Sequence, residues 1–362
     1  MPAYIHHIVT QVPQHASAQT EVRDRMKEWA PETKTRRLIQ TLYNRSGIET
    51  RHSVCPDFTA GSEPLLYFTD EQGLLVSPST GQRNRVYARA ARSLASETGR
   101  RLMEKATGFA PADITHIVFA SCTGFSNPGP DYHLIRDLGL SQSVERYTLG
   151  FMGCYAAFPA LRMAAQFCEA RPQAVVLVMC LELCTLHLQM TDQPDDILAH
   201  SLFADGAAAA IVSARPPTGP AWRMDSFESA LLPMGESDMA WDIGDQGFNI
   251  VLSSYVPDVI GTNIHGLLAG VLGRQEKIQT DVQNWAVHPG GRSILDKVSQ
   301  SLALPEDALQ TSRSILKDYG NMSSATILFV LARMLQQPVQ GTTCALAFGP
   351  GLTVETALLE PV

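Results

Sequence analysis

The 362-residue sequence predicts an α/β fold built from two related halves. Two observations support this prediction. Apolar, β-branched runs alternate with segments of helical periodicity, and the same order of elements occurs twice. A segment rich in proline and glycine, 215-RPPTGPAW-222, separates the two occurrences and indicates their boundary. We therefore predict an N-terminal half over residues 1–214 and a C-terminal half over residues 215–362.

The first half contains the clearest strand and helix patterns. Apolar runs predict strands at 114–122 and 174–183, and residues 160–170 have the periodicity of a helix. A further strand is expected at 207–214 in spite of its alanines, because two prolines follow at once. None of these runs approaches the roughly 20 apolar residues that a membrane helix needs.

The second half repeats the order of the first. A strand, VQNWAVHPGG, is followed by DYGNMSSAT, a helix (ATILFVLARML) and the strand TTCALAFGPG. Cys154 follows Cys122 by 32 residues, and Asn321 follows His288 by 33. Matching order and matching spacing indicate an internal duplication. Since loops at the ends of strands carry the chemistry of α/β proteins, we expect Cys154, His288 and Asn321 to converge.

Composition narrows the class of protein. The net charge of −8 argues against a nucleic-acid-binding surface. Seven cysteines, with no secretory pattern at the N-terminus, favour a reducing cytoplasm over a disulfide framework. Cys180 and Cys184 have the wrong spacing for a zinc site and no partner pair follows them, so no metal is expected.

Cys154 is the strongest candidate for a nucleophile. In 149-LGFMGCYAAF-158 it precedes a predicted helix, where unpaired backbone N–H groups favour a thiolate. Gly153 lets the chain turn sharply and leaves room for a ligand beside the sulfur. Cys168 and Cys180, by contrast, are expected to be buried structural cysteines.

His288 and Asn321 are candidate partners of that thiol. At the end of an apolar strand and ahead of Pro-Gly-Gly, an imidazolium could pair with a thiolate or donate to a carbonyl. Asn321 opens the helix equivalent to the one after Cys154, where it is either an N-cap or an amide donor for an oxyanion. Five other histidines are expected at the surface or in loops: His6, His7, His15, His52 and His200.

The motifs in this order resemble those of the chalcone synthase-like type III polyketide synthases, which have the thiolase fold. GFMGCYAA is similar to the family's nucleophile motif, VHPGG to its histidine motif and YGNMSSAT to its asparagine motif. AFGPGLTVET resembles the C-terminal glycine-rich signature, with Ala347 where glycine is usual. The resemblance covers nearly the whole chain, implies a layered αβαβα architecture, and suggests a bacterial-type member.

The resemblance implies an acyltransferase that acts on CoA thioesters. Cys154 would accept an acyl group from a starter acyl-CoA, and His288 and Asn321 would hold the enolate formed when malonyl-CoA loses carbon dioxide. The enolate would then attack the Cys154 thioester in repeated Claisen condensations. The family also implies a homodimer, CoA thioesters as substrates rather than cofactors, and no metal, nucleic acid or membrane.

Residues around the cavity are assigned by the same resemblance. It implies one gate at Phe203 and a second at or near Ile250, where the plant enzymes have phenylalanine, so the cavity is expected to differ from theirs. It implies cavity walls at Cys122, Thr123, Cys184, Leu186 and Ser323. The basic stretch with Lys34, Arg36, Arg37, Arg45 and Arg51 is expected to bind the CoA phosphates, chiefly through Arg37 and Arg45.

The small and aliphatic wall residues predict an apolar cavity, which favours a fatty acyl starter and an alkylpyrone or alkylresorcinol product. A synthase that uses only malonyl-CoA, forming a tetrahydroxynaphthalene or phloroglucinol, is the alternative that Cys184 would suit. A chain-initiating ketoacyl-ACP synthase uses the same Cys-His-Asn set, but GNMSS and FGPG argue against it. A papain-like hydrolase and an inactive relative are weaker alternatives. The starter, the extender, the number of extensions, the cyclisation and the delivery of the starter are left open.

Overall fold

We analysed a computed structural model of the chain, which describes residues 2–59, 61–232, 236 and 238–362. Its centre is a sheet with the strand order β13-β14-β15-β10-β1-β9-β8-β6-β7. These strands are β1 (Ala3–Gln11), β6 (His116–Ser121), β7 (Glu145–Gly150), β8 (Val175–Leu183), β9 (Asp205–Ser213), β10 (Trp222–Leu231), β13 (Val282–Val287), β14 (Thr342–Gly349) and β15 (Thr353–Pro361).

Three hairpins and the helices complete the fold. The hairpins are β2 (His15–Ala18) with β3 (Thr50–Ser53), β4 (Phe68–Thr69) with β5 (Leu75–Val76), and β11 (Met239–Gly244) with β12 (Gly247–Leu252). The α-helices are α1 (Gln19–Trp29), α2 (Thr33–Arg45), α3 (Thr80–Lys105), α4 (Pro130–Asp137), α5 (Ala157–Ala170), α6 (Pro194–Leu202), α7 (Val256–Gly273), α8 (Arg292–Ser301), α9 (Gln310–Tyr319) and α10 (Thr326–Met334).

Short 3₁₀ turns connect several of these elements. They are η1 (Pro56–Phe58), η2 (Pro111–Asp113), η3 (Cys184–His187), η4 (Gln279–Asp281), η5 (Ser323–Ala325) and η6 (Pro350–Leu352). The strands and helices predicted in the two halves are thus confirmed, with bounds that differ by a few residues. The segment 215–222 joins β9 to β10, as expected of a connection, while the division of the chain into two units stays a prediction.

The sheet shows the duplication directly. Reading outward from the central pair β1 and β10, one side runs β9, β8, β6 and the other runs β15, β14, β13. On both sides the first two pairings are antiparallel and the third is parallel. Helix α5 precedes β8, and α10 precedes the equivalent strand β14. The predicted fold of two duplicated halves is therefore confirmed.

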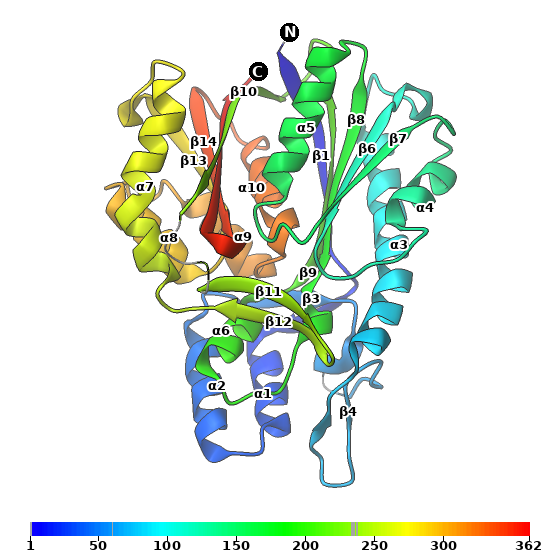
Figure 1. The fold of residues 1–362 in the computed structure, drawn as a ribbon, viewed down its shortest axis with the longest axis vertical. Coiled ribbons are helices and arrows are strands. Elements are labelled where there is room, and N and C mark those ends of the chain that lie inside the picture. The colour runs from blue at the N-terminus through cyan, green and yellow to red at the C-terminus, as the bar shows by residue number, and fades with distance from the viewer. Residues whose placement is uncertain (1, 60, 233–235, 237) are drawn as a thin grey trace.

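The elements form five layers. Figure 1 shows α5 and α10 between the two halves of the sheet, with α3 and α4 on one outer side and α7 and α8 on the other. One core joins α5 and α10 to buried residues of strands from both halves, and separate clusters lie under the two outer helix layers. Because β8 and β9 are covered on both faces, they are buried along their whole length, and they are accordingly continuous apolar runs.

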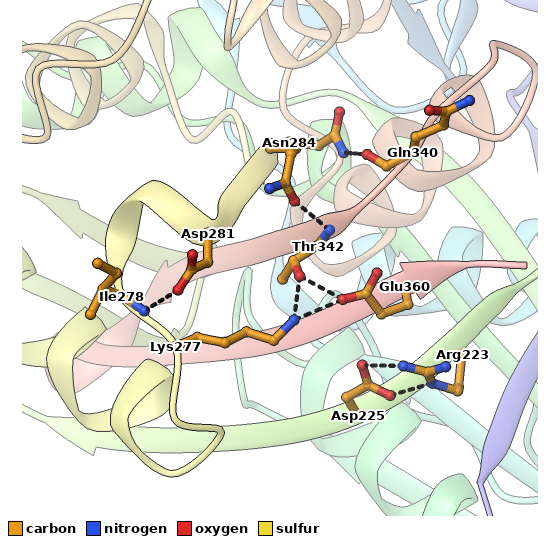
Figure 2. A network of polar contacts seen from close by, with 10 residues as sticks. Arg223, Asp225, Lys277, Ile278, Asp281, Asn284, Gln340, Thr342 and Glu360 are labelled. Carbon is orange, nitrogen blue, oxygen red and sulfur yellow. Dashed lines mark hydrogen bonds and ion pairs between the residues drawn. The ribbon is translucent and has the colours of Figure 1, made fainter.

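Polar contacts hold the outer strands of the second half together. The ammonium of Lys277, just after α7, lies 2.9 Å from Oε1 of Glu360 on β15, and the Thr342 hydroxyl of β14 donates to the same carboxylate oxygen at 2.5 Å. Figure 2 shows Lys277 reaching across these strands, beside the ion pair of Arg223 and Asp225 on β10. Within the described residues, no helix is long and apolar enough to cross a membrane.

Candidate active site

The three candidate residues come from three different connections and line one cavity. Cys154 lies in the turn between β7 and α5, His288 follows β13 directly, and Asn321 lies between α9 and η5. The three residues therefore converge at one end of the sheet, as we expected from the duplication.

The turn at Cys154 depends on glycine. Gly153 has φ +80°, a left-handed conformation that favours glycine. A Cβ at this position would lie 2.3 Å from Cδ of Pro350, in the loop after β14. The amide of Gly153 also contacts the sulfur of Cys122 at 3.1 Å. The glycine therefore allows the C-terminal loop to close over the turn that carries the thiol.

The protonation state of Cys154 differs from our expectation. A helix N-terminus was expected to acidify the thiol, but burial raises its pKa to about 11, and hydrogen bonds from Ser323 and Asn321 only partly oppose this effect. The thiol lies three residues before the first residue of α5 and lines the cavity. In these surroundings the neutral thiol is favoured, and a positively charged partner would favour the thiolate.

His288 is buried and has no fixed partner. Its backbone N–H donates to the carbonyl of Leu346 at 2.8 Å, which fixes the residue at the end of β13. Neither ring nitrogen has a hydrogen-bond partner among the described residues, and burial lowers the pKa of the ring to about 3. The expected imidazolium is therefore a neutral imidazole in these buried surroundings, and both ring nitrogens are available for a hydrogen bond.

Asn321 is held in one orientation. Its Oδ1 accepts from the amide of Ser323 at 2.9 Å, and its Nδ2 donates to the carbonyl of Gly290 at 3.1 Å. The same Nδ2 lies 4.0 Å from Sγ of Cys154. The residue was expected to open a helix, but η5 separates it from α10 and its backbone bridges to Phe203. It is therefore a positioned amide donor and not a helix N-cap.

The catalytic cavity, as we call the space lined by these three residues, is mostly apolar. The hairpin β11–β12 covers it, and the indole N–H of Trp241 in this hairpin donates to the carbonyl of Cys122 at 3.0 Å. The apolar lining that the sequence motifs did not identify comprises Met239, Ala240, Trp241, Val251, Leu252 and Ile294, whereas Phe348 and Pro350 belong to the C-terminal motif AFGPGLTVET. The strands of the hairpin have mixed burial, so no sequence signal marked its lining residues.

The residues assigned to gate and walls are mostly where the resemblance put them. Phe203 and Ile250 line the catalytic cavity together with Cys122, Thr123, Cys184 and Ser323. The assignment of Leu186 to the wall is wrong, because its side chain is fully buried in the core next to α3 and is not among the lining residues. It lies in η3, whose turn directs Cys184 to the cavity and Leu186 away from it.

Glu182 is a buried acid that our sequence analysis missed. It has no exposed surface, and its carboxylate accepts from the amide of Cys122 at 2.9 Å and from the hydroxyls of Thr123 at 3.0 Å and Ser324 at 2.6 Å. Burial raises its pKa to about 7, and its charge raises the pKa of Cys154. A charged residue inside the apolar run of β8 was the signal that could have marked it.

A groove leads from the catalytic cavity toward the basic stretch. It shares Leu252, Gly290 and Ile294 with the cavity and carries Arg45 and Arg292 at its sides. Arg37 is exposed on α2 but does not line this groove. Arg292 was not identified from the sequence, because it stands alone among apolar and small residues.

The surroundings of two further basic residues and of two histidines differ from those that the sequence led us to expect. Arg51 is buried and donates to backbone carbonyls, and Arg36 donates to the carbonyl of Ala30 at 2.8 Å. The expectation that His6 and His200 lie at the surface is wrong, because both side chains are buried. Both are held by hydrogen bonds in the interior, His6 to Ser213 at 2.9 Å and His200 to the amide of Gln189 at 3.2 Å.

Family models and known relatives were compared with the chain. Residues 2–216 match the N-terminal domain of chalcone and stilbene synthases, and residues 224–362 match the C-terminal domain. An alpha-pyrone synthesis polyketide synthase-like protein of Mycobacterium tuberculosis is 31% identical over 99% of this chain and 91% of its own length. A probable polyketide synthase of Dictyostelium discoideum is 32% identical over 97% of this chain, which spans 11% of that much longer protein.

Solved structures agree with these matches. A polyketide synthase, PKS-I, from the brown alga Ectocarpus siliculosus has a TM-score of 0.90 at 32% identity, covering 100% of this chain and 98% of its own. The C-terminal type III polyketide synthase domain of Steely1, a type I/III hybrid from Dictyostelium, has a TM-score of 0.89 at 30% identity, with 100% of both chains covered. A fungal type III polyketide synthase, ORAS, has a TM-score of 0.87 at 28% identity, again over 100% of both chains.

Proposed function

Because the chain belongs to the chalcone and stilbene synthase family of type III polyketide synthases, which are CoA-dependent acyltransferases, we propose that it condenses acyl groups at Cys154. The observation that supports this site is the convergence of Cys154, His288 and Asn321 on one mostly apolar cavity. A thiol, an unpartnered imidazole and an oriented amide are the groups that a decarboxylative Claisen condensation needs.

In the first step Cys154 attacks the thioester of the starter acyl-CoA. His288 accepts the thiol proton, because an opposite charge nearby favours both the thiolate and the imidazolium against the burial that keeps them neutral in the empty cavity. The bond between the acyl carbon and CoA breaks, and CoA leaves as a thiol with a proton. The products are an acyl group on Cys154 and free CoA.

In the second step malonyl-CoA loses carbon dioxide to form an enolate. The N–H groups of His288 and Asn321 stabilise the negative enolate oxygen, because preorganised donors in a dry cavity have a stronger effect than in water. The enolate carbon attacks the acyl carbon, and the sulfur of Cys154 leaves as a thiolate. The chain, now longer by two carbons and carried as its CoA thioester, is transferred to Cys154 with release of CoA for another extension, or it cyclises.

The starter is proposed to be a fatty acyl-CoA and the product an alkylpyrone or alkylresorcinol. The apolar lining contributed by the hairpin β11–β12 supports this choice, and so does the similarity to an alpha-pyrone synthesis relative. A synthase that uses only malonyl-CoA is the alternative, since Cys184 in the cavity wall suits it. CoA would reach the cavity along the groove beside Arg45 and Arg292, whose charges suit its phosphates.

The enzyme is further proposed to work in the cytoplasm as a homodimer, without a metal or other cofactor. The described residues contain no group of three or more side chains that could hold a metal ion. Light scattering of the purified protein tests the oligomeric state, and a monomer at micromolar concentration would contradict a homodimer.

The deciding experiment incubates the protein with malonyl-CoA and acyl-CoA starters from acetyl to palmitoyl, with products identified by mass spectrometry. We expect pyrones or resorcinols that carry the starter's alkyl chain. Products built from malonyl-CoA alone would favour the alternative, and a single condensation that requires an acyl carrier protein would overturn the proposal. Cys154→Ala is expected to abolish acyl loading but to retain part of malonyl-CoA decarboxylation, because the enolate is held by other residues.

A further inference from the structure

A second chamber adjoins the catalytic cavity and differs from it in polarity. The two spaces share Cys184, Phe203 and Ile250 as a common wall. Beyond this wall, which includes the gate residue Phe203, the second chamber extends under the hairpin β2–β3. Its lining combines the apolar side chains of Val22, Phe58 and Leu188 with six polar ones. The polar residues are Ser17, Arg51, His52, Ser53, Thr185 and His200.

Arg51 is the notable member of this set because a buried guanidinium is normally fully paired. It is 5% exposed, and its Nη1 donates to the carbonyls of His200 at 2.7 Å and Phe203 at 2.8 Å. Its Nε and Nη2 have no acceptor among the described residues. Two nitrogens of a buried cation, with three N–H bonds between them, are therefore left for an acceptor that the described residues do not provide.

The nearest acid does not fill this role. Asp205 is buried, and the charge of Arg51 partly opposes the rise in its pKa that burial causes, but no ion pair joins the two among the described residues. The carboxylate oxygens of Asp205 instead accept from the amides of Val54 and Thr185, each at 2.8 Å, and from the Thr185 hydroxyl at 2.7 Å. The acid is thus already satisfied by other donors.

Among the remaining polar groups of the chamber, His200 provides one further hydrogen-bond donor. The Ser53 hydroxyl is paired with that of Thr185 at 2.7 Å, so neither proton is free. Burial lowers the pKa of His200 to about 3, so the ring is neutral, and its Nε2 accepts from the amide of Gln189. The ring proton is therefore on Nδ1, which gives the chamber a second free donor beside Arg51.

We propose that this chamber binds one keto oxygen of the extended chain while the chain is attached to Cys154, with Arg51 as its main donor. The inference rests on the proposed function. A starter with a purely hydrocarbon chain has no oxygen to satisfy these donors, whereas each condensation adds one keto group. The chamber therefore selects chains that have already been extended, and it stabilises the longer intermediates against early release.

Arg51 also has a structural role, and the experiment must separate the two. Its Nη1 caps the carboxyl end of α6, where a cation is favourable, and its guanidinium lies over the ring of Tyr43 at 5.4 Å. Arg51→Lys retains a cation that can reach the two carbonyls but lacks the Nε and Nη2 donors. Tyr43→Phe is the matched control, because it removes a hydroxyl that donates to the same His200 carbonyl at 3.3 Å and leaves the chamber donors in place.

The test compares products of wild type, Arg51→Met, Arg51→Lys and Tyr43→Phe, all supplied with one acyl-CoA and malonyl-CoA. Mass spectrometry gives the ratio of products with two or more extensions to those with one, normalised to acyl loading on Cys154. We expect this ratio to fall at least tenfold in both Arg51 variants and to stay within twofold of wild type in Tyr43→Phe. Melting temperatures show which variants are folded. If Arg51→Met does not fold, the product ratio of Arg51→Lys alone decides the test.

Three results would overturn the inference. One is an unchanged ratio in folded Arg51→Lys, which would leave Arg51 only its structural role. Another is an equal fall of the ratio in Tyr43→Phe, which would assign the effect to α6. The third is an unchanged product ratio in the Arg51 variants together with a raised KM for malonyl-CoA decarboxylation, which would make the guanidinium a site for the malonyl carboxylate. If wild type makes no polyketide, the proposed function itself has failed.

Discussion

At the scale of single residues, burial decides the chemistry of this site more than local sequence does. The thiol of Cys154 is predicted from its turn, but its raised pKa arises from chain segments more than a hundred residues away that close the cavity, among them the loop at Pro350. A sequence motif shows which groups are present, whereas desolvation depends on the complete fold. The neutral state of His288 has the same origin.

Gly153 provides a test of the turn that carries the Cys154 thiol. Gly153→Ala places a Cβ at φ +80° and against Pro350, so we expect a loss of about 2–4 kcal/mol in the free energy of unfolding and a loss of most acyl loading. Gly139→Ala is the control, because Gly139 has φ +64° but nothing within 4 Å of the added Cβ. Denaturant unfolding and loading on Cys154 measure both, and equal effects of the two substitutions would refute the steric account.

Glu182 predicts a pH dependence of stability. Its pKa is about 7 in the folded protein, above the ordinary value of 4.5, so between these values the folded state keeps a proton that the unfolded state releases. Stability therefore falls as pH rises from about 4.5 to 7 and is level above it, with an effect on the order of 3 kcal/mol.

The substitution Glu182→Gln isolates this contribution. Glutamine can accept from Cys122 and Thr123 through its oxygen and donate to Ser324, so the hydrogen bonds are retained without a titrating group. Denaturant unfolding at pH 5, 6, 7 and 8 should give a smaller decline for the variant than for wild type. Parallel curves for the two proteins would show that Glu182 does not titrate in this range.

At the scale of elements, the sequence predicted what is periodic and missed what depends on packing partners. Strands β6, β8 and β14 were recognisable because their two faces are buried in two adjoining hydrophobic clusters, and helix α10 because it is buried in the middle one. The hairpin β11–β12 was not, because its strands have mixed burial and become a cavity wall only through contacts with distant segments. The second chamber was missed for the same reason, since it lies between elements and not within one.

Ile250 links this hairpin to both spaces, because its side chain lies in the wall that they share. Ile250→Phe adds bulk there, so we expect products shorter by at least one extension, with acyl loading on Cys154 reduced no more than about threefold. Ile243→Phe, at an exposed position of the same hairpin, is the control for effects on the hairpin as a whole. Product masses from one starter decide, and a similar shortening in both variants would contradict the role of the wall.

At the scale of the whole molecule, the middle layer makes one structure of the two halves. Helix α5 presents Ala157, Ala160 and Ala164 to the core, all fully buried, and small side chains let it approach the sheet closely. The same helix contacts β10 and β15 of the second half, and its Arg162 forms an ion pair with Glu355 of β15. The duplication visible in the sequence thus explains why there are two halves. Their packing against each other depends on the small size of the buried residues of α5, which the motifs do not indicate.

Ala160→Leu therefore tests whether the two halves unfold together. Three additional carbons in a fully packed layer have no space, so we expect a loss of about 1–3 kcal/mol or more in the free energy of unfolding. Gln166→Leu adds a leucine to an exposed position of the same helix and should change stability by less than about 0.5 kcal/mol. Because α5 contacts both halves, calorimetry should show a single transition that moves as a whole in Ala160→Leu. A variant in which only part of the transition shifts would show that the halves are independent folding units, in which case the cavity at their junction could not owe its geometry to a shared core.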